Sequence, residues 1–132
     1  ANNVVSQIRE TGQNAATLKL DVGEIKSFDD FVSKLQTLLV QEFETDKLDF
    51  LINNAGIGTT IPIADVTEED FDKLVNIHFK GVYFLTQKLL PHIQDGGRII
   101  NISSGTTRFA NPGYSVYASA KSAIETFTRY LA

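Results

Sequence analysis

Apolar residues alternate along the chain between helical spacing and short continuous runs, which predicts a succession of helices and strands. Three apolar residues that share one helical face precede Gly12, and glycine is typical of the position after a helix. Residues 16–22 form a strand candidate. Ser27, with Asp30 three positions later, has the form of a capping box, and the apolar stripe that follows predicts a helix ending near Phe43.

The second half of the chain repeats this alternation. Residues 48–53 (LDFLIN) form a compact apolar run of strand length. A threonine followed by three acidic residues opens a helix expected over 67–90, which is apolar on more than one side. A strand over 98–103 and a helix over 116–131 complete the series.

This order of elements predicts an α/β fold, namely a partial Rossmann-type doubly wound parallel sheet with flanking helices. No repeat or flexible linker divides residues 1–132, so we expect a single domain. Ligands of such folds bind beyond the carboxyl ends of the strands. Asp21 and the ranges 53–56 and 103–105 occupy these ends here.

Composition narrows the classes of partner. Apolar residues make up 42% of the chain and charged residues 21%, as in an ordinary globular protein, and the net charge of −4 argues against a nucleic-acid partner. No apolar run approaches the roughly 18 residues that span a bilayer, so no membrane partner is expected. The chain has no cysteine, and its two histidines, His78 and His92, make a weak metal site, so we expect no metal.

Tyr117 and Lys121 are the strongest local sign of chemistry. They stand four residues apart at the start of a predicted helix and therefore share one face. A lysine charge about 6 Å from a phenol favours the phenolate by roughly 2–3 kcal/mol at an intermediate dielectric. The pair is thus suited to acid–base work, and an exposed helical pair without chemistry is the alternative.

Three further features of the sequence could act together with the Tyr117–Lys121 pair. Ser104 follows a predicted strand and could present a hydroxyl to a substrate oxygen; Ser103 is the rival candidate, and a plain polar turn is the alternative. Residues 53–56 (Asn-Asn-Ala-Gly) read either as a turn or as backbone shaped for a ligand. Asn76 lies inside a helix, where asparagine has low propensity, and a surface position is its alternative role.

Together these features resemble the short-chain dehydrogenase/reductase family across essentially the whole chain. The resemblance rests on Asp21-Val22, residues 48–56 (LDFLINNAG), Asn76, residues 98–104 (RIINISS), Pro112-Gly113 and residues 117–121 (YASAK).

The resemblance implies a catalytic set of Asn76, Ser104, Tyr117 and Lys121. Tyr117 would exchange a proton with the oxygen of an alcohol or ketone substrate while a hydride passes to or from a nicotinamide. Lys121 would favour the phenolate and bind the nicotinamide ribose. Ser104 would polarise the carbonyl, and Asn76 would hold a water that relays protons.

The resemblance also implies the binding residues. The cofactor would be NAD or NADP, with a lean to NADP, held by Asp21, Val22, Asn53, Ala55, Gly56, Tyr117 and Lys121. The substrate would be walled by Thr106, Tyr114 and the 57–63 loop.

Part of the family pattern is absent from this sequence. The glycine-rich pyrophosphate turn is missing, and Gly56-Ile57-Gly58 does not replace it, because Ile61 stands where the third glycine belongs and Pro62 follows. The chain also lacks methionine and the family's later substrate lobe. We therefore expect an internal part of a longer protein, in which residues 16–22 cannot pair with residues 48–53 because the intervening strands of the 3-2-1-4-5-6 order are missing.

Two alternatives to an oxidoreductase remain open at this stage. One is a noncatalytic binding protein that keeps the fold, and the other is an isomerase or dehydratase that uses the same residues without net redox change. The resemblance further implies a homodimer or homotetramer built through helices 67–90 and 116–131, a small-molecule substrate and a cytoplasmic location.

Overall fold

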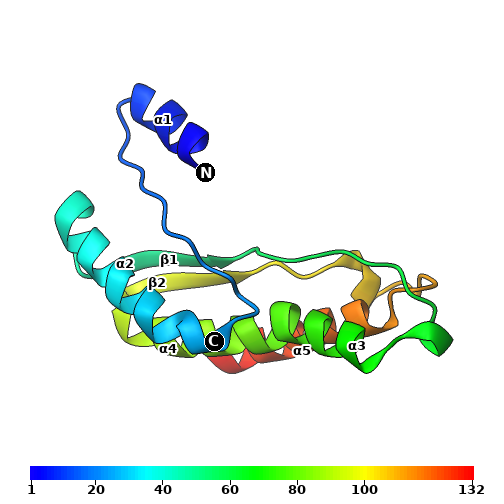
Figure 1. Cartoon of the computed structure of the whole chain (residues 1–132). Coiled ribbons are helices and arrows are strands. Elements are labelled where there is room, and N and C mark those ends of the chain that lie inside the picture. Colours follow the sequence, from blue (N-terminus) through cyan, green and yellow to red (C-terminus); the bar gives the residue numbers. More distant parts are fainter.

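The computed structural model describes all 132 residues and confirms an α/β arrangement of one parallel sheet with flanking helices. Figure 1 shows the sheet lying along one side of a layer of helices. The elements are α1 (Asn2–Glu10), α2 (Phe28–Phe43), β1 (Leu48–Asn53), α3 (Glu68–Val75), α4 (Gly81–Leu89), β2 (Ile93–Asn101) and α5 (Ser115–Leu131), joined by short 3₁₀ turns at Ile25–Ser27, Ile63–Asp65, Leu90–His92 and Gly105–Thr107. No helix is long and apolar enough to cross a membrane.

The core lies between the sheet, α2 and α4. Phe28, Leu85 and Leu89 are buried together, and apolar residues from α2, from β1 and from the segment before α2 pack against them. Each buried side chain of this size stabilises the fold by about 1.5–3 kcal/mol. The helical apolar stripes predicted from the sequence are therefore the surfaces that join the two layers.

The predicted strand over 16–22 is wrong. Residues 13–21 are extended but belong to no ladder, because the sheet contains only β1 and β2. An extended segment becomes a strand only when a neighbouring strand accepts its backbone hydrogen bonds. As expected from the strand order, this segment does not pair with β1. Leu20 and Val22 instead attach it to the core by their side chains.

The two predicted helix starts behave differently. The Ser27 capping box is absent, because a 3₁₀ turn places Ser27 in a helical conformation and its hydroxyl donates to the Glu24 carbonyl at 2.7 Å. At the second start, the Thr67 hydroxyl accepts from the Asp70 backbone, and the Asp70 carboxylate reciprocates. The helix start at Thr67 is thus confirmed and has full capping-box geometry.

The helix predicted over 67–90 is present but contains a π turn. Residues Asn76–Lys80 form this wider turn between α3 and α4, and the Gly81 amide donates to the Asn76 carbonyl. A π turn adds one residue to a helical turn and shifts the phase of everything beyond it. It also lies beside the segment that ends at Val22, because a methyl group on Gly81 would collide with the Val22 carbonyl.

The two strands are parallel and in register at their carboxyl ends. Ile52 pairs with Ile100 and Asn53 with Asn101. β2 begins at Ile93 rather than at residue 98. The pairing register shifts between Leu48 and Phe50, so β2 has more residues than β1 over this stretch. The chain of β2 turns there at Gly96, whose φ is +82°. The chain leaves β2 after Asn101 and continues directly into Ser103 and Ser104.

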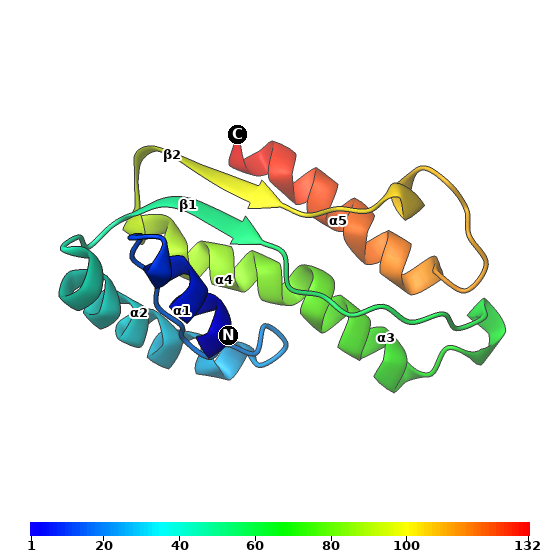
Figure 2. The ribbon, with the colours of Figure 1, turned by 90° about the horizontal axis from the view of Figure 1, so that it is seen from above.

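One face of the sheet is uncovered. Phe50 and Ile52 of β1 are 62% and 58% exposed, and Ile100 of β2, which pairs with Ile52, lies on the same side. Figure 2 views the molecule from this side and shows β1 and β2 next to each other, with α4 and α5 behind them and α1 in front of the helical layer. α1 has no buried residue and reaches α2 through the Arg9–Glu42 ion pair.

We predict that Gly81→Ala destabilises the protein by about 3 kcal/mol, although alanine has the better helix propensity by about 1 kcal/mol. The added methyl group meets backbone atoms of Val22 and Asn76, which cannot rotate away. Urea denaturation measures the change. Gly58→Ala is the matched control, since nothing lies within 4 Å of its added carbon, and equal losses in the two variants would contradict the prediction.

Candidate active site

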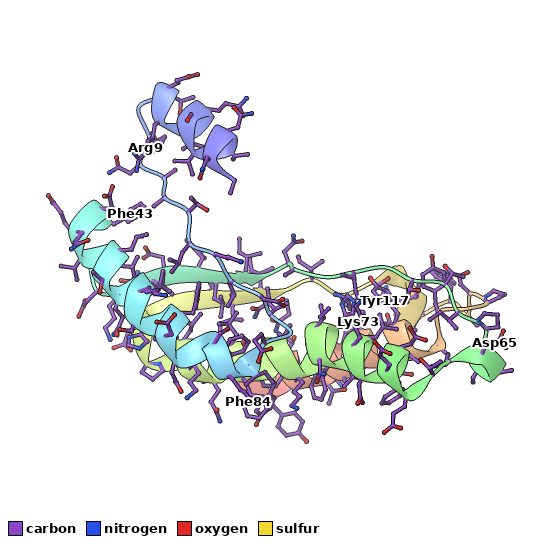
Figure 3. The ribbon with its side chains drawn as sticks, viewed as in Figure 1. Arg9, Phe43, Asp65, Lys73, Phe84 and Tyr117 are labelled. Atoms are coloured by element: carbon purple, nitrogen blue, oxygen red, sulfur yellow. The ribbon has the colours of Figure 1, made fainter.

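Tyr117 and Lys121 face each other in the first turns of α5. The Lys121 ammonium lies 5.7 Å from the centre of the Tyr117 ring, close to the separation expected from their spacing. Figure 3 shows Tyr117 between the helical layer and the segments that leave the sheet. The structure therefore brings together the two residues with the clearest chemical sign in the sequence.

Lys121 is held at the carboxyl end of β2. Its side chain is only 6% exposed, and its ammonium donates to the Ile102 carbonyl at 2.7 Å. Desolvation by burial lowers the pKa of Lys121. The hydrogen bond fixes the position of the ammonium next to the tyrosine, and only one of its three protons is used for this.

The structure separates the two candidate serines. Ser103 donates to the Glu125 carboxylate at 2.6 Å, and Thr107 donates to the same oxygen at 2.9 Å. Ser104 instead accepts from the backbone and hydroxyl of Thr106, so its own proton remains available for donation. Ser103 therefore links the end of β2 to α5 through Glu125. Ser104 is the serine whose hydroxyl can donate to a substrate oxygen.

Asn53 points away from the ligand crevice. Its side-chain amide donates to Thr86 at 3.1 Å and to Asn101 at 2.8 Å, and Asn101 in turn donates to Thr128. This buried chain joins β1 to α4, β2 and α5. Asn53 thereby helps to hold the backbone of the exposed Ala55 and Gly56 in place.

Asn76 lies on a different side of the helix from the Tyr117–Lys121 pair. It lines an open hollow together with Asp21 and Gly23, and none of the residues that line it comes from β2 or α5. Asp21 accepts from the Gly23 amide at 2.9 Å, which shapes this turn. The sequence placed Asn76 and Asp21 at separate points of the site, whereas the structure makes them neighbours.

His78 is a site residue that the sequence reasoning missed. It is 1% exposed, its ring meets the Tyr117 ring edge-on at 4.9 Å between centroids, and it bonds to the backbone of Ile57. Desolvation by burial lowers its pKa, the Ile57 hydrogen bond raises it, and the charge of Lys121 lowers it. A histidine inside an apolar helical stretch is the sequence signal that could have found it.

The predicted substrate residues line one open hollow of about 940 Å³. Thr106 and Tyr114 are part of its wall, together with Pro62, Ile63 and Phe109. Tyr114 also contacts Tyr117, with ring centroids 6.0 Å apart. The hollow thus lies next to the tyrosine and has mainly apolar walls.

The assembled geometry can perform proton transfer beside a bound small molecule. A half-buried phenol, a buried ammonium and a buried imidazole lie together at the end of β2, and Ser104 follows two residues after Ile102. This is also where ligands bind in open α/β sheets.

The comparison with known families agrees with this geometry. Residues 1–132 match the model of the family described as short chain dehydrogenase. The chain therefore belongs to the short-chain dehydrogenase/reductase family.

Curated relatives of the chain include two proteins named as reductases. The chain is 36% identical to versicolorin reductase stcU of Emericella nidulans and 36% identical to a probable tetrahydroxynaphthalene reductase of Zymoseptoria tritici. Both matches cover 100% of this chain and 48% of the relative, so the chain spans about half the length of these proteins.

Solved structures give the same picture. The reductase LugOII, which catalyses keto-reduction at C1 in lugdunomycin biosynthesis, superposes with a TM-score of 0.93 at 33% identity over 99% of this chain and 53% of its own. The angucycline C-6 ketoreductase LanV with bound NADP superposes at 0.91 and 35% identity over 98% of this chain and 52% of its own.

We predict that Ser103→Ala raises the pKa of Glu125 toward its ordinary value of 4.5. The hydrogen bond from Ser103 is the main cause of the lowered pKa, followed by that from Thr107. A lowered carboxyl pKa stabilises the fold above pH 4.5, and this stabilisation is lost as pH falls through the folded-state value. The variant should therefore lose less stability on acidification than the wild type.

Carbon NMR of the Glu125 carboxyl group and urea midpoints above and below pH 4.5 measure the two effects. Ser122→Ala is the control, because Ser122 is exposed on the same helix. An unchanged Glu125 titration in Ser103→Ala would contradict the assignment of Ser103 to this junction.

Proposed function

We propose that this chain carries the catalytic part of an oxidoreductase that transfers a hydride between NADP(H) and an alcohol or ketone. The observation that carries the proposal is the Tyr117–Lys121 pair, fixed by the Ile102 carbonyl at the end of β2. The NADP-bound ketoreductase LanV, 35% identical to this chain, supports NADP as the cofactor.

The residues present fit the nicotinamide end of such a cofactor. Ala55 and Gly56 expose their backbone where β1 ends, and Lys121 keeps an ammonium proton for a ribose hydroxyl. Asp21 and Val22 are assigned to the adenine end by the family resemblance, and Asp21 lines an open hollow whose other charged residues are mostly acidic. When bound, the cofactor would supply or accept the hydride.

The side chains of this chain would handle the proton. In ketone reduction Tyr117 donates its phenolic proton to the substrate oxygen, while the Ser104 hydroxyl donates a hydrogen bond to the same oxygen. The Lys121 charge stabilises the phenolate that remains. In alcohol oxidation the same atoms act in reverse.

The hollow beside Tyr114 supports a substrate with a flat apolar body. Its walls combine aromatic and aliphatic side chains, including Phe109, which is 70% exposed and free to cover a ligand. Phenanthrenequinone, a flat apolar dicarbonyl, is therefore a suitable substrate with which to test the proposed activity.

We predict that Tyr117→Phe lowers kcat for NADPH-dependent reduction of phenanthrenequinone by on the order of 10²–10⁴, because the proton donor is lost. NADPH binding, followed by its fluorescence, should persist, since the ring remains. Ser104→Ala should lower kcat more than Ser103→Ala, whose hydroxyl faces Glu125.

Three results would overturn the proposal. They are full activity in Tyr117→Phe, no binding of NADPH by the wild-type protein, and product formation without net oxidation of NADPH. The last result would identify an isomerase or dehydratase, and the second would identify a noncatalytic member of the fold.

We also propose that two copies associate through α4 and α5. The outer sides of these helices form an apolar groove around Tyr83 and Phe127, whose rings lie 4.8 Å apart. Tyr130, at its end, is 85% exposed. The groove coincides with the helices expected to form an oligomer interface.

We predict that Phe127→Glu yields a smaller species than the wild type in sedimentation velocity at equal concentration. A charge in the centre of the groove would remain unpaired in the buried interface. Thr126→Glu, on the same helix at the edge of the groove, is the control and should weaken association less. Equal sedimentation of wild type and Phe127→Glu would exclude this surface.

A further inference from the structure

His78 and Asn76 face opposite sides of the same helix. They are two residues apart, and residues at that spacing do not share a helical face. The π turn Asn76–Lys80 places Asn76 in the hollow with Asp21 and places His78 against Tyr117. The helix therefore presents an imidazole to the Tyr117–Lys121 pair.

The hydrogen bonds of His78 define its protonation. Its Nε2 lies 2.7 Å from the Ile57 carbonyl and 3.3 Å from the Ile57 amide. One ring nitrogen cannot donate and accept at once, and the shorter contact assigns Nε2 as the donor to the carbonyl. The neutral tautomer with its proton on Nε2 leaves Nδ1 as an acceptor.

Nδ1 is buried and has no hydrogen-bond partner within the protein. A buried acceptor without a donor costs about 1–3 kcal/mol, so an atom of this kind indicates a partner that arrives with a ligand or with solvent. Gly56 leaves space for the ring, because a carbon added there would lie 2.7 Å from Cε1 and 3.2 Å from Nδ1.

The charged surroundings of His78 are simple. From α5, Tyr117 and Lys121 face the ring, and Lys121 is the charge that acts on it. The 53–57 segment contributes only uncharged groups, and Asp21 lies on the Asn76 side of the helix. The nearest charged donor is Lys121, so a water held between Lys121 and the ring can supply the donor that Nδ1 lacks.

We propose that His78, rather than Asn76, is the positioning residue that completes the Tyr117–Lys121 site, with its Nδ1 linked to the Lys121 ammonium through one water that accepts from the ammonium and donates to Nδ1. This inference rests on the proposed oxidoreductase function. Through Nε2 the same ring holds Ile57, and with it the loop that carries Gly56, at a fixed distance from Tyr117.

The role has a consequence for pH. Protonation of Nδ1 removes the acceptor and places a second positive charge beside Lys121. Because desolvation lowers the pKa of His78 below 6.5, the neutral form prevails at neutral pH, and the activity should fall only as pH drops below 6.5.

The kinetic test compares three variants in NADPH-dependent reduction of phenanthrenequinone. His78→Leu keeps the bulk but no polar atom and should lose kcat on the order of 10² at every pH, as misplaced catalytic groups do. His78→Asn can still donate to Ile57 and accept, so it should stay within about tenfold of wild type without the acidic limb caused by His78. Asn76→Ala should lose less kcat than His78→Leu.

A second measurement does not depend on catalytic activity. Nitrogen NMR of the imidazole groups in the full protein, assigned by difference with His78→Asn, should show the Nε2–H tautomer and a pKa below 6.5. Addition of NADPH should shift the His78 Nδ1 signal, because the donor beside it is then ordered.

The outcomes separate this inference from the proposed function. An inactive Tyr117→Phe together with a fully active His78→Leu, or a larger loss in Asn76→Ala, overturns the role of His78 and leaves the oxidoreductase in place. A proton on Nδ1 instead of Nε2 overturns it as well. Full activity in Tyr117→Phe overturns the proposed function itself.

Discussion

The hydrogen bond from the Lys121 ammonium to the Ile102 carbonyl is the contact on which the site depends. It ties the first turns of α5 to the end of β2, and it places a positive charge beside Tyr117 although the lysine is almost fully buried. Burial of an ammonium is costly unless its protons are bonded. The carbonyl of Ile102 offsets part of that cost, and two of the three ammonium protons remain for a ligand or a water.

A second set of polar contacts supports this arrangement from below. Asn53 links β1 to Thr86 on α4 and to Asn101 on β2, and Asn101 continues to Thr128 on α5. The two strands and the helices α4 and α5 are thus joined by one chain of side-chain hydrogen bonds next to the site. Buried networks of this kind fix the relative placement of elements that apolar packing alone would leave free to slide. These hydrogen bonds therefore also fix the position of the exposed backbone of residues 54–56.

Patterns in the sequence predicted most elements because each depends on local spacing. The helices over 28–43 and 116–131, the strand over 48–53 and the Tyr117–Lys121 pairing followed from apolar periodicity and from the geometry of a helix. The strand over 16–22 was wrong because a strand needs a partner, which local sequence does not reveal. Ser27 failed as a cap because of a preceding 3₁₀ turn. His78 was missed because the π turn changes which side of the helix faces α5, and no spacing rule announces such a turn.

Because of the π turn, the deletion of a single residue would change which side chains face the site. Removal of one residue from the 76–80 segment would convert it to an ordinary α turn and rotate α3 by about 100° relative to α4. Such a deletion would exchange the side chain presented to Tyr117 without any substitution at that side chain. Relatives that are one residue shorter or longer in this turn can therefore have the same residue types and yet present different side chains to the substrate. Sequences have to be aligned across this turn by structure.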